Sequence, residues 1–243
     1  PVKVGAPVGD IGAGLLATIG VLAAVEERHR SGLGQRVDTS LFEAALFQTL
    51  WQSAIYLASG DVPHAMGSAH PLDGPYQAFK TKDDWIVIGA ANQANWLRLL
   101  RVLDAEHLAE EPRFLENPDR MQNLAQLVET LTPIFEQYGA KIWLDKLAGC
   151  SVPAAPILSM DKVLNHPQAL ARDMVVDIEH PELGPTKTLG LPIKFSRTPG
   201  KVDGVVSPKL GEHAREVLRA AGRADDEIEQ AFKDGVLSGQ NGA

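Results

Sequence analysis

One carboxylate near the start of the chain has the surroundings that a nucleophile needs. Asp10 stands in the run Gly9-Asp10-Ile11-Gly12-Ala13-Gly14, which leads directly into apolar residues with helical spacing. A carboxylate at a helix start is stabilised by free backbone N–H groups and by the positive end of the helix dipole. The small neighbours leave room for a substrate. The same arrangement suits an ordinary helix cap, which is the more common role, so the residues alone leave both roles open.

The glycines also fit a dinucleotide-binding site, which is a weaker alternative. The segment from Gly12 to Ala17 matches G-x-G-x-x-A, and Asp38 follows further along the chain. Two features oppose this interpretation. Pro7 interrupts the strand that should precede the glycines, and Asp10 would place a negative charge beside the pyrophosphate. Small residues that allow a helix to pack closely are therefore the favoured explanation.

A second candidate region is the loop Met66-Gly67-Ser68-Ala69-His70-Pro71. Its small residues expose backbone N–H groups that are suited to an anionic or carbonyl-bearing ligand. Composition alone, however, favours a flexible connector between two substructures. The sequence therefore leaves two roles open for this loop, ligand binding and connection of the two substructures.

Other catalytic or metal-binding patterns are weak or missing in the sequence. The seven histidines form no ligand pair, and His64 and His70 stand six apart in a loop, so no metal site is predicted. Cys150 is the single cysteine, which excludes disulfides within the chain and favours a reducing compartment. No G-x-S-x-G motif is present, which disfavours a serine hydrolase.

The bulk composition is that of an ordinary globular protein. The chain has 243 residues, of which 44% are hydrophobic and 22% charged, and its net charge is −8. The negative charge argues against a nucleic-acid partner, which would require clustered Lys and Arg. The apolar segment Ile11–Val25 is punctuated by glycine and shorter than the ~18 residues that span a bilayer. We therefore expect a cytoplasmic protein with no membrane partner.

Periodicity and breaker residues predict an α/β segment, an α+β insert and a return to α/β. The predicted helices begin at Asp10, Ser40, Asn92, Leu124, Trp143, Glu212 and Asp225. The helix from Ser40 has a capping box and should run to Ser59, and the one from Leu124 should be kinked or divided at Pro133. The predicted strands are Gln35–Asp38, Pro75–Phe79, Trp85–Gly89, Met174–Ile178 and Thr188–Leu191.

Two sets of apolar residues stand out. The residues Ile11, Leu15, Ile19 and Leu22 share one face of the first predicted helix. The four tryptophans are each expected in the core, because each stands at a helical or strand position compatible with one: Trp51, Trp85, Trp96 and Trp143.

Several motifs follow one another in an order that is more specific than any single motif. They are Gly9–Gly14, Val21–Arg28, Ser31–Leu41, His70-Pro71, Gly74–Phe79, Trp85–Gly89, Val152–Pro156, Leu191–Ser196 and Leu210–His213. Together they closely resemble the family III CoA-transferases, the group that includes formyl-CoA transferase and the carnitine and bile-acid CoA-transferases. The similarity extends over nearly the whole chain.

The resemblance implies a fold and an assembly. It implies part of a Rossmann-like large domain over residues 1–66, a smaller α+β domain over 67–170, and a return to the large domain over 171–243. It also implies an interlocked homodimer. Most residues that bind the CoA nucleotide in this family precede the aspartate. We therefore expect that the chain lacks an N-terminal CoA-binding segment and binds CoA poorly as given.

The resemblance also implies a reaction. The catalytic aspartate of the family falls on Asp10, which would carry CoA from an acyl-CoA donor to a carboxylic acid as an aspartyl-CoA thioester. The loop over the active site falls on Gly67, Ser68, Ala69 and His70 as substrate-binding residues. Gly12 and Leu41 are implied near CoA, which acts as a substrate, with no tightly bound cofactor and no metal.

Departures from the family pattern bear on the substrate and on the reaction. The loop has one glycine where formyl-CoA transferase has a run, so oxalate is not supported as the acid. The fold also hosts α-methylacyl-CoA racemases, whose glutamate partner would fall near Asn92, and an amide cannot exchange a proton near neutral pH. This favours transfer over racemisation. A chain without turnover, as a scaffold or an incomplete product, remains a further alternative.

Overall fold

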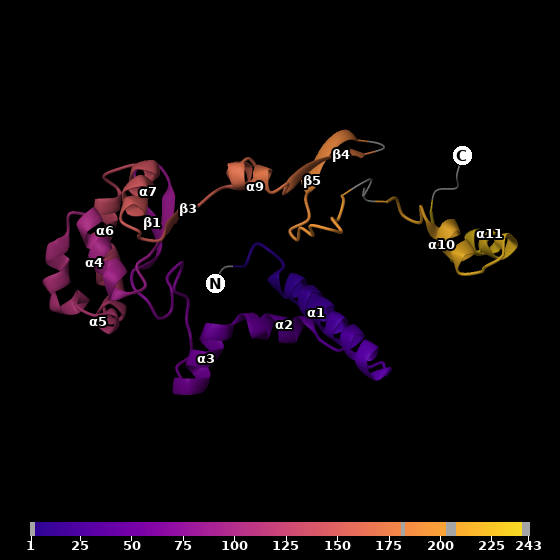
Figure 1. Cartoon of the computed structure of the whole chain (residues 1–243), viewed down its shortest axis with the longest axis horizontal. Helices are drawn as coiled ribbons and strands as arrows, with labels where there is room; N and C mark the ends of the chain where they lie inside the picture. Colours follow the sequence, from indigo (N-terminus) through magenta and orange to yellow (C-terminus); the bar gives the residue numbers. More distant parts are fainter. Residues whose placement is uncertain (1–2, 181–182, 203–207, 240–243) are drawn as a thin grey trace. The chain divides into compact units, whose positions relative to one another are not determined.

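The computed structural model describes residues 3–180, 183–202 and 208–239. It divides into two compact units, Pro1–Ile157 and Leu158–Ala243 (Figure 1). The three domain ranges expected from the family resemblance stay a prediction, because the two units do not test where the large domain ends and resumes.

The first unit begins with three helices. Helix α1 spans Val8–Ser31, α2 spans Leu41–Gln48 and α3 spans Leu50–Ser59. Helix α1 packs against α2. The helix cap at Ser40 is confirmed, because its hydroxyl accepts a hydrogen bond from the Glu43 N–H at 3.2 Å, but the reciprocal half of the capping box is not formed, since the Glu43 carboxylate accepts from the Ser40 hydroxyl instead. The predicted single helix is divided at Thr49, whose hydroxyl bonds back to the Leu46 carbonyl at 2.7 Å.

The apolar stripe of α1 does not face a core in this structure. No residue of α1 is buried, and the exposed fractions of Leu15, Ile19 and Leu22 are 61%, 63% and 64%. The predicted helix is therefore confirmed, and its apolar face is exposed among the described residues. By length and composition alone, α1 could also cross a membrane, which corrects the expectation that no apolar segment is long enough. A single such helix is weak evidence, since the core helix of a soluble protein passes the same test.

A three-stranded antiparallel sheet forms the centre of the remaining part of the first unit. Its order is β1 (Tyr76–Lys80), β2 (Trp85–Gly89) and β3 (Ala154–Pro156). In the register, Phe79 lies opposite Ile86, and Ile86 lies opposite Pro156. The first two strands confirm the predicted pair, whereas β3 lies in a Pro-rich segment that did not read as a strand.

Helices cover this sheet and complete a hydrophobic core. They are α4 (Gln93–Val102), α5 (Asn117–Gln122), α6 (Leu124–Phe135) and α7 (Ala140–Gly149), with 3₁₀ helices at Glu106–Glu110 and Pro112–Phe114. Helix α6 contacts β1, and α7 contacts β2 and β3. Helix α6 is not divided at Pro133, which lies within its last turn. Asn92 caps α4, as predicted.

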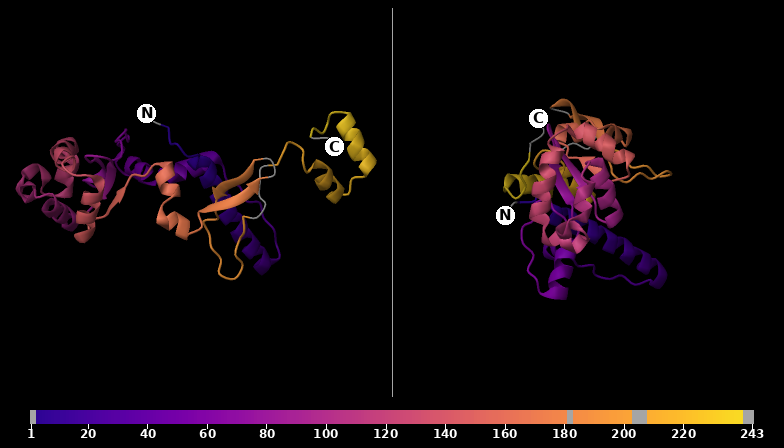
Figure 2. Two further views of the ribbon diagram at one scale, coloured as in Figure 1. Left: turned by 90° about the horizontal axis from the view of Figure 1, so that it is seen from above. Right: turned by 90° about the vertical axis from the view of Figure 1, so that its left-hand side faces the viewer.

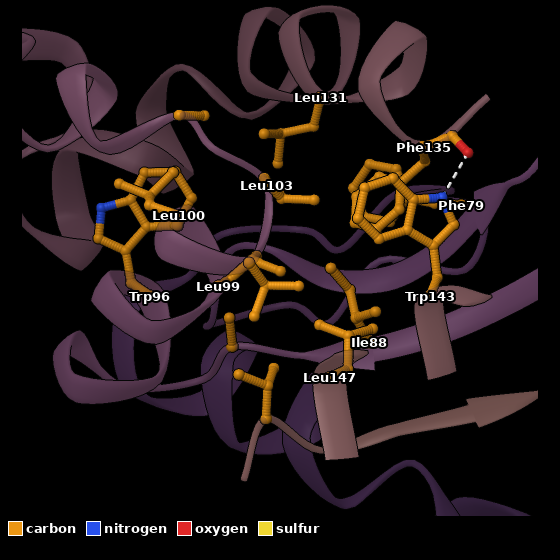
Figure 3. Close-up of a cluster of buried hydrophobic side chains, with 14 of the residues drawn as sticks. Phe79, Ile88, Trp96, Leu99, Leu100, Leu103, Leu131, Phe135, Trp143 and Leu147 are labelled. Carbon is orange, nitrogen blue, oxygen red and sulfur yellow. Dashed lines mark hydrogen bonds between the residues drawn. The ribbon is translucent and has the colours of Figure 1, made fainter. Parts of the chain in front are cut away.

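The core itself is aromatic and aliphatic (Figure 3). Trp143 Nε1 donates a hydrogen bond to the Phe135 carbonyl at 2.7 Å, which satisfies its polar atom inside the core. Trp96 and Trp143 are buried as expected, but Trp51 and Trp85 are 54% and 47% exposed, so the core prediction is wrong for these two. The labelled core residues are Phe79, Ile88, Trp96, Leu99, Leu100, Leu103, Leu131, Phe135, Trp143 and Leu147.

The second unit has little buried apolar surface among its described residues. Its elements are α8 (Met160–Leu164), α9 (Pro167–Ala171), β4 (Val175–His180), β5 (Gly184–Leu189), α10 (Ala214–Ala220) and α11 (Asp225–Lys233). Strands β4 and β5 form an antiparallel pair, visible from above in Figure 2. Helices α10 and α11 are joined by an ion pair between Arg215 and Glu229.

Two local predictions are corrected by the structure, and one objection to the dinucleotide site is supported. Helix α1 begins at Val8, so Asp10 is its third residue, and the N-cap position is Pro7, without a side-chain cap hydrogen bond. The prediction of a strand at 35–38 is wrong, because this segment follows α1 without a strand partner. Residues 3–7 also form no strand, which removes the structural context of a dinucleotide fingerprint.

One tertiary helix cap gives a pH-dependent prediction. Asp83 Oδ1 accepts hydrogen bonds from the Ala140 N–H at 2.8 Å and from the Thr81 hydroxyl at 3.1 Å. The bond from Ala140 is the main reason that the pKa of Asp83 lies below its usual value of 3.8. A carboxyl group with a lowered pKa stabilises the folded state above its unfolded pKa, and this contribution is lost as the pH falls through the folded pKa.

We therefore expect the Asp83→Asn variant to unfold at a lower temperature than the wild type near neutral pH. The difference should shrink as the pH falls below 3.8. Thermal unfolding at a series of pH values measures this. Asp145→Asn is the matched control, because Asp145 makes only an exposed ion pair with Lys141 and should give little change at any pH. A difference that is constant with pH would contradict the explanation.

Candidate functional site

The carboxylate of Asp10 is exposed in the first turn of α1. Within the described ranges, its side chain makes no hydrogen bond and no ion pair, so none of the described residues occupies its oxygens. Its place in the first turn puts the negative charge at the positive end of the helix dipole. An exposed carboxylate without a partner is available to react with an incoming electrophile.

The glycines beside Asp10 let α1 approach α2 closely. A Cβ at Gly12 would lie 2.3 Å from Gln48 Nε2, and one at Gly9 would lie 3.8 Å from the Ala45 Cβ. The amide of Gln48 fills this space and donates a hydrogen bond to the Val8 carbonyl at 2.9 Å. The favoured explanation for these small residues, close helix packing, therefore holds at Gly12, whereas a Cβ at Gly9 would make only ordinary van der Waals contacts. At Gly14 an added Cβ would meet no atom within 4 Å.

The segment Met66–Gly74, called the loop segment below, is bound on one side to β1. The Ser68 hydroxyl accepts a hydrogen bond from the Ala78 N–H at 3.1 Å, and the His70 N–H donates to the Tyr76 carbonyl at 2.8 Å. The imidazole of His70 stacks on the Tyr76 ring, with ring centres 5.1 Å apart, and meets the edge of Trp51 at 4.5 Å. These contacts hold the loop segment in place, so it is not the flexible connector that composition alone favoured.

The tip of the loop segment leaves backbone donors exposed. The Ala69 N–H donates to the Met66 carbonyl at 3.2 Å, which closes a tight turn. Gly67 occupies this turn with φ +63°, a left-handed conformation that favours glycine. Neither the Gly67 N–H nor the Ser68 N–H finds an acceptor in the part of the chain that the structure describes. Two adjacent free N–H groups are suited to a carboxylate or a thioester carbonyl.

The side chain of His70 is held through one ring nitrogen. Nδ1 lies 3.2 Å from the Leu72 N–H and 3.3 Å from Asp73 Oδ2. The first contact requires a bare Nδ1 and the second a protonated one, so the partner that Nδ1 takes depends on the protonation of the ring. The nitrogen Nε2 makes no hydrogen bond to any described residue, and it is the polar atom that His70 offers a ligand.

Tyr76 also lines an open pocket of about 380 Å³ at the end of the sheet. Asn95 and the backbone of Gly89 contribute to the wall, which has no charged side chain. The pocket therefore offers no counter-charge to a carboxylate, and its apolar wall suits an uncharged part of a substrate. The pocket lining is Tyr76, Val87, Ile88, Gly89, Ala91, Asn95, Pro153, Ala154 and Ala155.

The predicted site residues fall into two groups that no hydrogen bond or ion pair joins within the described residues. Asp10 and Gly12 lie on α1, and Leu41 is the first residue of α2, with 55% of its surface exposed. Gly67, Ser68, Ala69 and His70 lie together in the loop segment. The described residues also hold no cluster of three or more potential metal ligands.

Two residues that hold the loop segment were not found from the sequence. Asn117 and Arg120 of α5 contact the loop backbone more than forty positions away in the chain. They stand in a polar stretch whose composition is typical of an exposed helix start, and no pattern in it signals these contacts.

Comparison with known proteins supplies the identity of the fold. The solved structure of a CAIB/BAIF family protein from Brucella suis is similar, with a TM-score of 0.72 and 35% sequence identity. The match covers 91% of this chain and 57% of that one. An acyl-CoA transferase of Fusarium pseudograminearum is 36% identical over 241 residues, covering 98% of this chain and 52% of the relative. The human succinyl-CoA:glutarate CoA-transferase is 30% identical over 238 residues, covering 98% and 54%.

The described elements and the similar solved structure define a mixed α/β fold. The model of CoA-transferase family III matches residues 1–214, and the chain belongs to this family. The family resemblance and the fold class predicted from the sequence are thus confirmed. The chain spans about half the length of the curated relatives that it matches.

Proposed function

We propose that the complete protein transfers CoA from an acyl-CoA donor to a carboxylic acid, with Asp10 as the nucleophile. The observation that carries this proposal is the exposed Asp10 carboxylate, without a partner among the described residues, in the first turn of α1. Membership of CoA-transferase family III supports the reaction class.

The proposed reaction runs through an aspartyl-CoA thioester. An oxygen of Asp10 attacks the donor thioester carbonyl, the C–S bond breaks, and a mixed anhydride and the CoA thiolate result. The thiolate then attacks the aspartyl carbonyl, which forms the aspartyl-CoA thioester and releases the donor acid. The acceptor carboxylate attacks this thioester, and the released thiolate attacks the acceptor acyl group of the new anhydride. Acceptor acyl-CoA leaves, and the Asp10 carboxylate is restored.

The other site residues take roles in binding. We assign Gly67, Ser68, Ala69 and His70 to the substrate, because two backbone N–H groups and Nε2 of His70 have no partner among the described residues and can bind a ligand there. The residues Gly12 and Leu41 are proposed to lie near CoA. In this scheme CoA is a substrate that enters and leaves, and no tightly bound cofactor takes part in the transfer.

Succinyl-CoA and a small dicarboxylic acid are the first substrates to test. Relatives are named succinyl-CoA:glutarate CoA-transferase in Homo sapiens and succinyl-CoA--D-citramalate CoA-transferase in Chloroflexus aurantiacus. The free N–H groups at Gly67 and Ser68 support recognition of a carboxylate. The pocket beside Tyr76 has no charged lining and does not supply this recognition.

Asn92 favours transfer over racemisation. Its Oδ1 accepts a hydrogen bond from the Asn95 N–H at 2.9 Å and thereby caps α4. An amide used as a helix cap offers no proton to the carbon beside a thioester. Exchange of that carbon's proton in deuterated water, without an acceptor acid, would instead support the racemase reaction.

We also propose that the complete protein forms a homodimer. Large apolar side chains of α1 are exposed over half of their surface, and contiguous apolar surface of this kind is typical of a protein interface. The molar mass of the complete protein by light scattering tests this.

Covalent trapping tests the proposed function. The complete protein is incubated with succinyl-CoA and then with hydroxylamine, which converts an aspartyl thioester into a hydroxamate. We expect mass spectrometry to find the hydroxamate on the peptide containing Asp10, and none without succinyl-CoA. An unmodified Asp10 in a protein that still transfers CoA would overturn the assignment.

A further inference from the structure

The loop segment is anchored on a second side, by α5. The carboxamide of Asn117 makes two hydrogen bonds to it: Oδ1 accepts from the Gly74 N–H at 3.0 Å, and Nδ2 donates to the Leu72 carbonyl at 2.7 Å. The guanidinium of Arg120 donates from Nε to the Gly74 carbonyl at 2.7 Å. Both backbone groups of Gly74 are therefore bound by side chains of α5.

The donors on α5 are themselves held in place. Arg120 is fully buried, its Nη1 donates to Gln93 Oε1 at 2.9 Å and to the Phe114 carbonyl at 3.1 Å, and its guanidinium carbon lies 5.1 Å from the Trp96 ring centre. Asn117 is not needed to start α5. The capping box of Glu116 and Asp119 does this, with the Glu116 N–H donating to Asp119 Oδ2 at 3.0 Å.

Close packing at Gly74 adds a steric constraint. A Cβ there would lie 3.2 Å from Met121 Sδ and 3.3 Å from Leu124 Cδ1, so the chain passes against α5 and α6 with little room to shift. The loop segment is thus bound by β1 at Ser68 and His70 and by α5 at Leu72 and Gly74. The free N–H groups of Gly67 and Ser68 lie at the end of a segment that is held from both sides.

We propose that Asn117 and Arg120 are positioning residues that hold the loop segment so that Gly67, Ser68 and His70 meet the carboxylate or thioester carbonyl of the substrate. This inference rests on the proposed function, because it assumes that the loop segment binds substrate. Neither residue touches the substrate, and both act through the backbone of Leu72 and Gly74. Donors that are fixed before binding do not lose conformational freedom when the substrate arrives, so loosening them weakens binding.

Asn117 is the residue to change, because it is partly exposed and α5 keeps its own cap without it. In the complete protein, Asn117→Ala removes both hydrogen bonds to the loop segment. Asn117→Asp keeps an oxygen that accepts from Gly74 but places a second acceptor oxygen against the Leu72 carbonyl, where the two acceptors repel, so it should loosen the loop segment at least as much as Asn117→Ala. Asn123→Ala is the matched control, since the Asn123 amide lies on the same stretch of chain and bonds to Asp119 and Arg113 instead of the loop.

Two measurements decide the outcome. Amide hydrogen exchange over residues 66–74 without substrate should be about tenfold faster in Asn117→Ala than in the wild type and in Asn123→Ala. With succinyl-CoA and glutarate, the KM for glutarate should rise about tenfold in Asn117→Ala and at least as much in Asn117→Asp, while kcat changes less. If Asn117 had only a structural role, KM and kcat would not change by such different factors.

Unchanged exchange in Asn117→Ala overturns the inference, and so does faster exchange with an unchanged KM. A wild-type protein that transfers no CoA overturns the proposed function instead. In that case the exchange experiment, which contains no substrate, still shows whether Asn117 holds the loop segment. The two failures are therefore distinguishable.

Discussion

Replacing Asp10 by asparagine is expected to lower the rate of CoA transfer by at least ~10³-fold, because the amide cannot attack a thioester. The substitution keeps the size and shape of the side chain. Asp10 is exposed and makes no hydrogen bond with the described residues, so the fold should be retained. The loss of one charge from the first turn of a helix costs about 0.3–1 kcal/mol, which is small beside the effect on the rate.

Two further variants separate the chemistry from the charge. Asp10→Glu keeps a carboxylate and moves it by one methylene group. Since a displacement of about 1 Å can cost ~10²-fold in rate, this variant should also be strongly impaired. Glu26→Gln is the matched control: it removes one carboxylate from an exposed position on the same helix and should leave the rate unchanged.

Steady-state transfer from succinyl-CoA to glutarate by the complete proteins provides the measurement, with circular dichroism to check the fold. Near-normal activity in Asp10→Asn would contradict the nucleophile assignment, whatever the trapping experiment gave. Equal losses in Asp10→Asn and Glu26→Gln would point to a general effect of charge on α1 and would contradict it as well.

Local signals in the sequence predicted the fold well where short-range chemistry decides it. The Ser40 and Asn92 caps and the end of α3 at Gly60 are formed as expected, because each depends on residues within one turn. The break at Thr49 was missed because a threonine hydroxyl that bonds back to the preceding turn competes with a continuous helix, and composition does not reveal this.

Burial was harder to predict, because periodicity identifies a face without identifying its partner. Trp96 lies on the covered face of α4, whereas Trp51 lies on α3 and contacts the His70 ring while most of its surface remains open. The stripe of α1 has the same limitation. Its spacing defines an apolar face, but what covers that face depends on contacts beyond this chain's described residues.

The candidate site shows the same division. The position of Asp10 and the small residues around it could be read directly, and the loop segment could be read as a source of free N–H groups. The contacts of Asn117 and Arg120 with Leu72 and Gly74 could not, since they join positions that are distant in sequence through backbone atoms. Every residue has a backbone carbonyl, so the residue types in the sequence do not show which carbonyl a buried arginine will bind.

Replacing Arg120 by methionine is expected to destabilise the first unit by about 3–5 kcal/mol, because it leaves buried acceptors without donors. The guanidinium donates hydrogen bonds to the Gly74, Phe114 and Leu115 carbonyls and to Gln93 Oε1. Burial lowers the pKa of Arg120, while the nearby carboxylates of Glu116, Asp119 and Asp73 act in the opposite direction. An arginine keeps its charge under these conditions, and the cost of burying that charge is offset by the hydrogen bonds.

Arg120→Lys should fall between the wild type and Arg120→Met, because one ammonium group cannot reproduce the planar fork that reaches acceptors on several sides. Arg113→Met is the matched control, since the Arg113 side chain is 44% exposed, lies over the Phe114 ring, and bonds to Glu111 and Gln126 at the surface, where an ion pair contributes about 0–1 kcal/mol. Chemical denaturation followed by tryptophan fluorescence measures all three, because Trp96 and Trp143 are buried in the same core. If Arg120→Met lost no more stability than Arg113→Met, the guanidinium would not be what fixes Gly74 against α5, and the anchoring of the loop segment would have to come from Asn117 and the packing at Gly74.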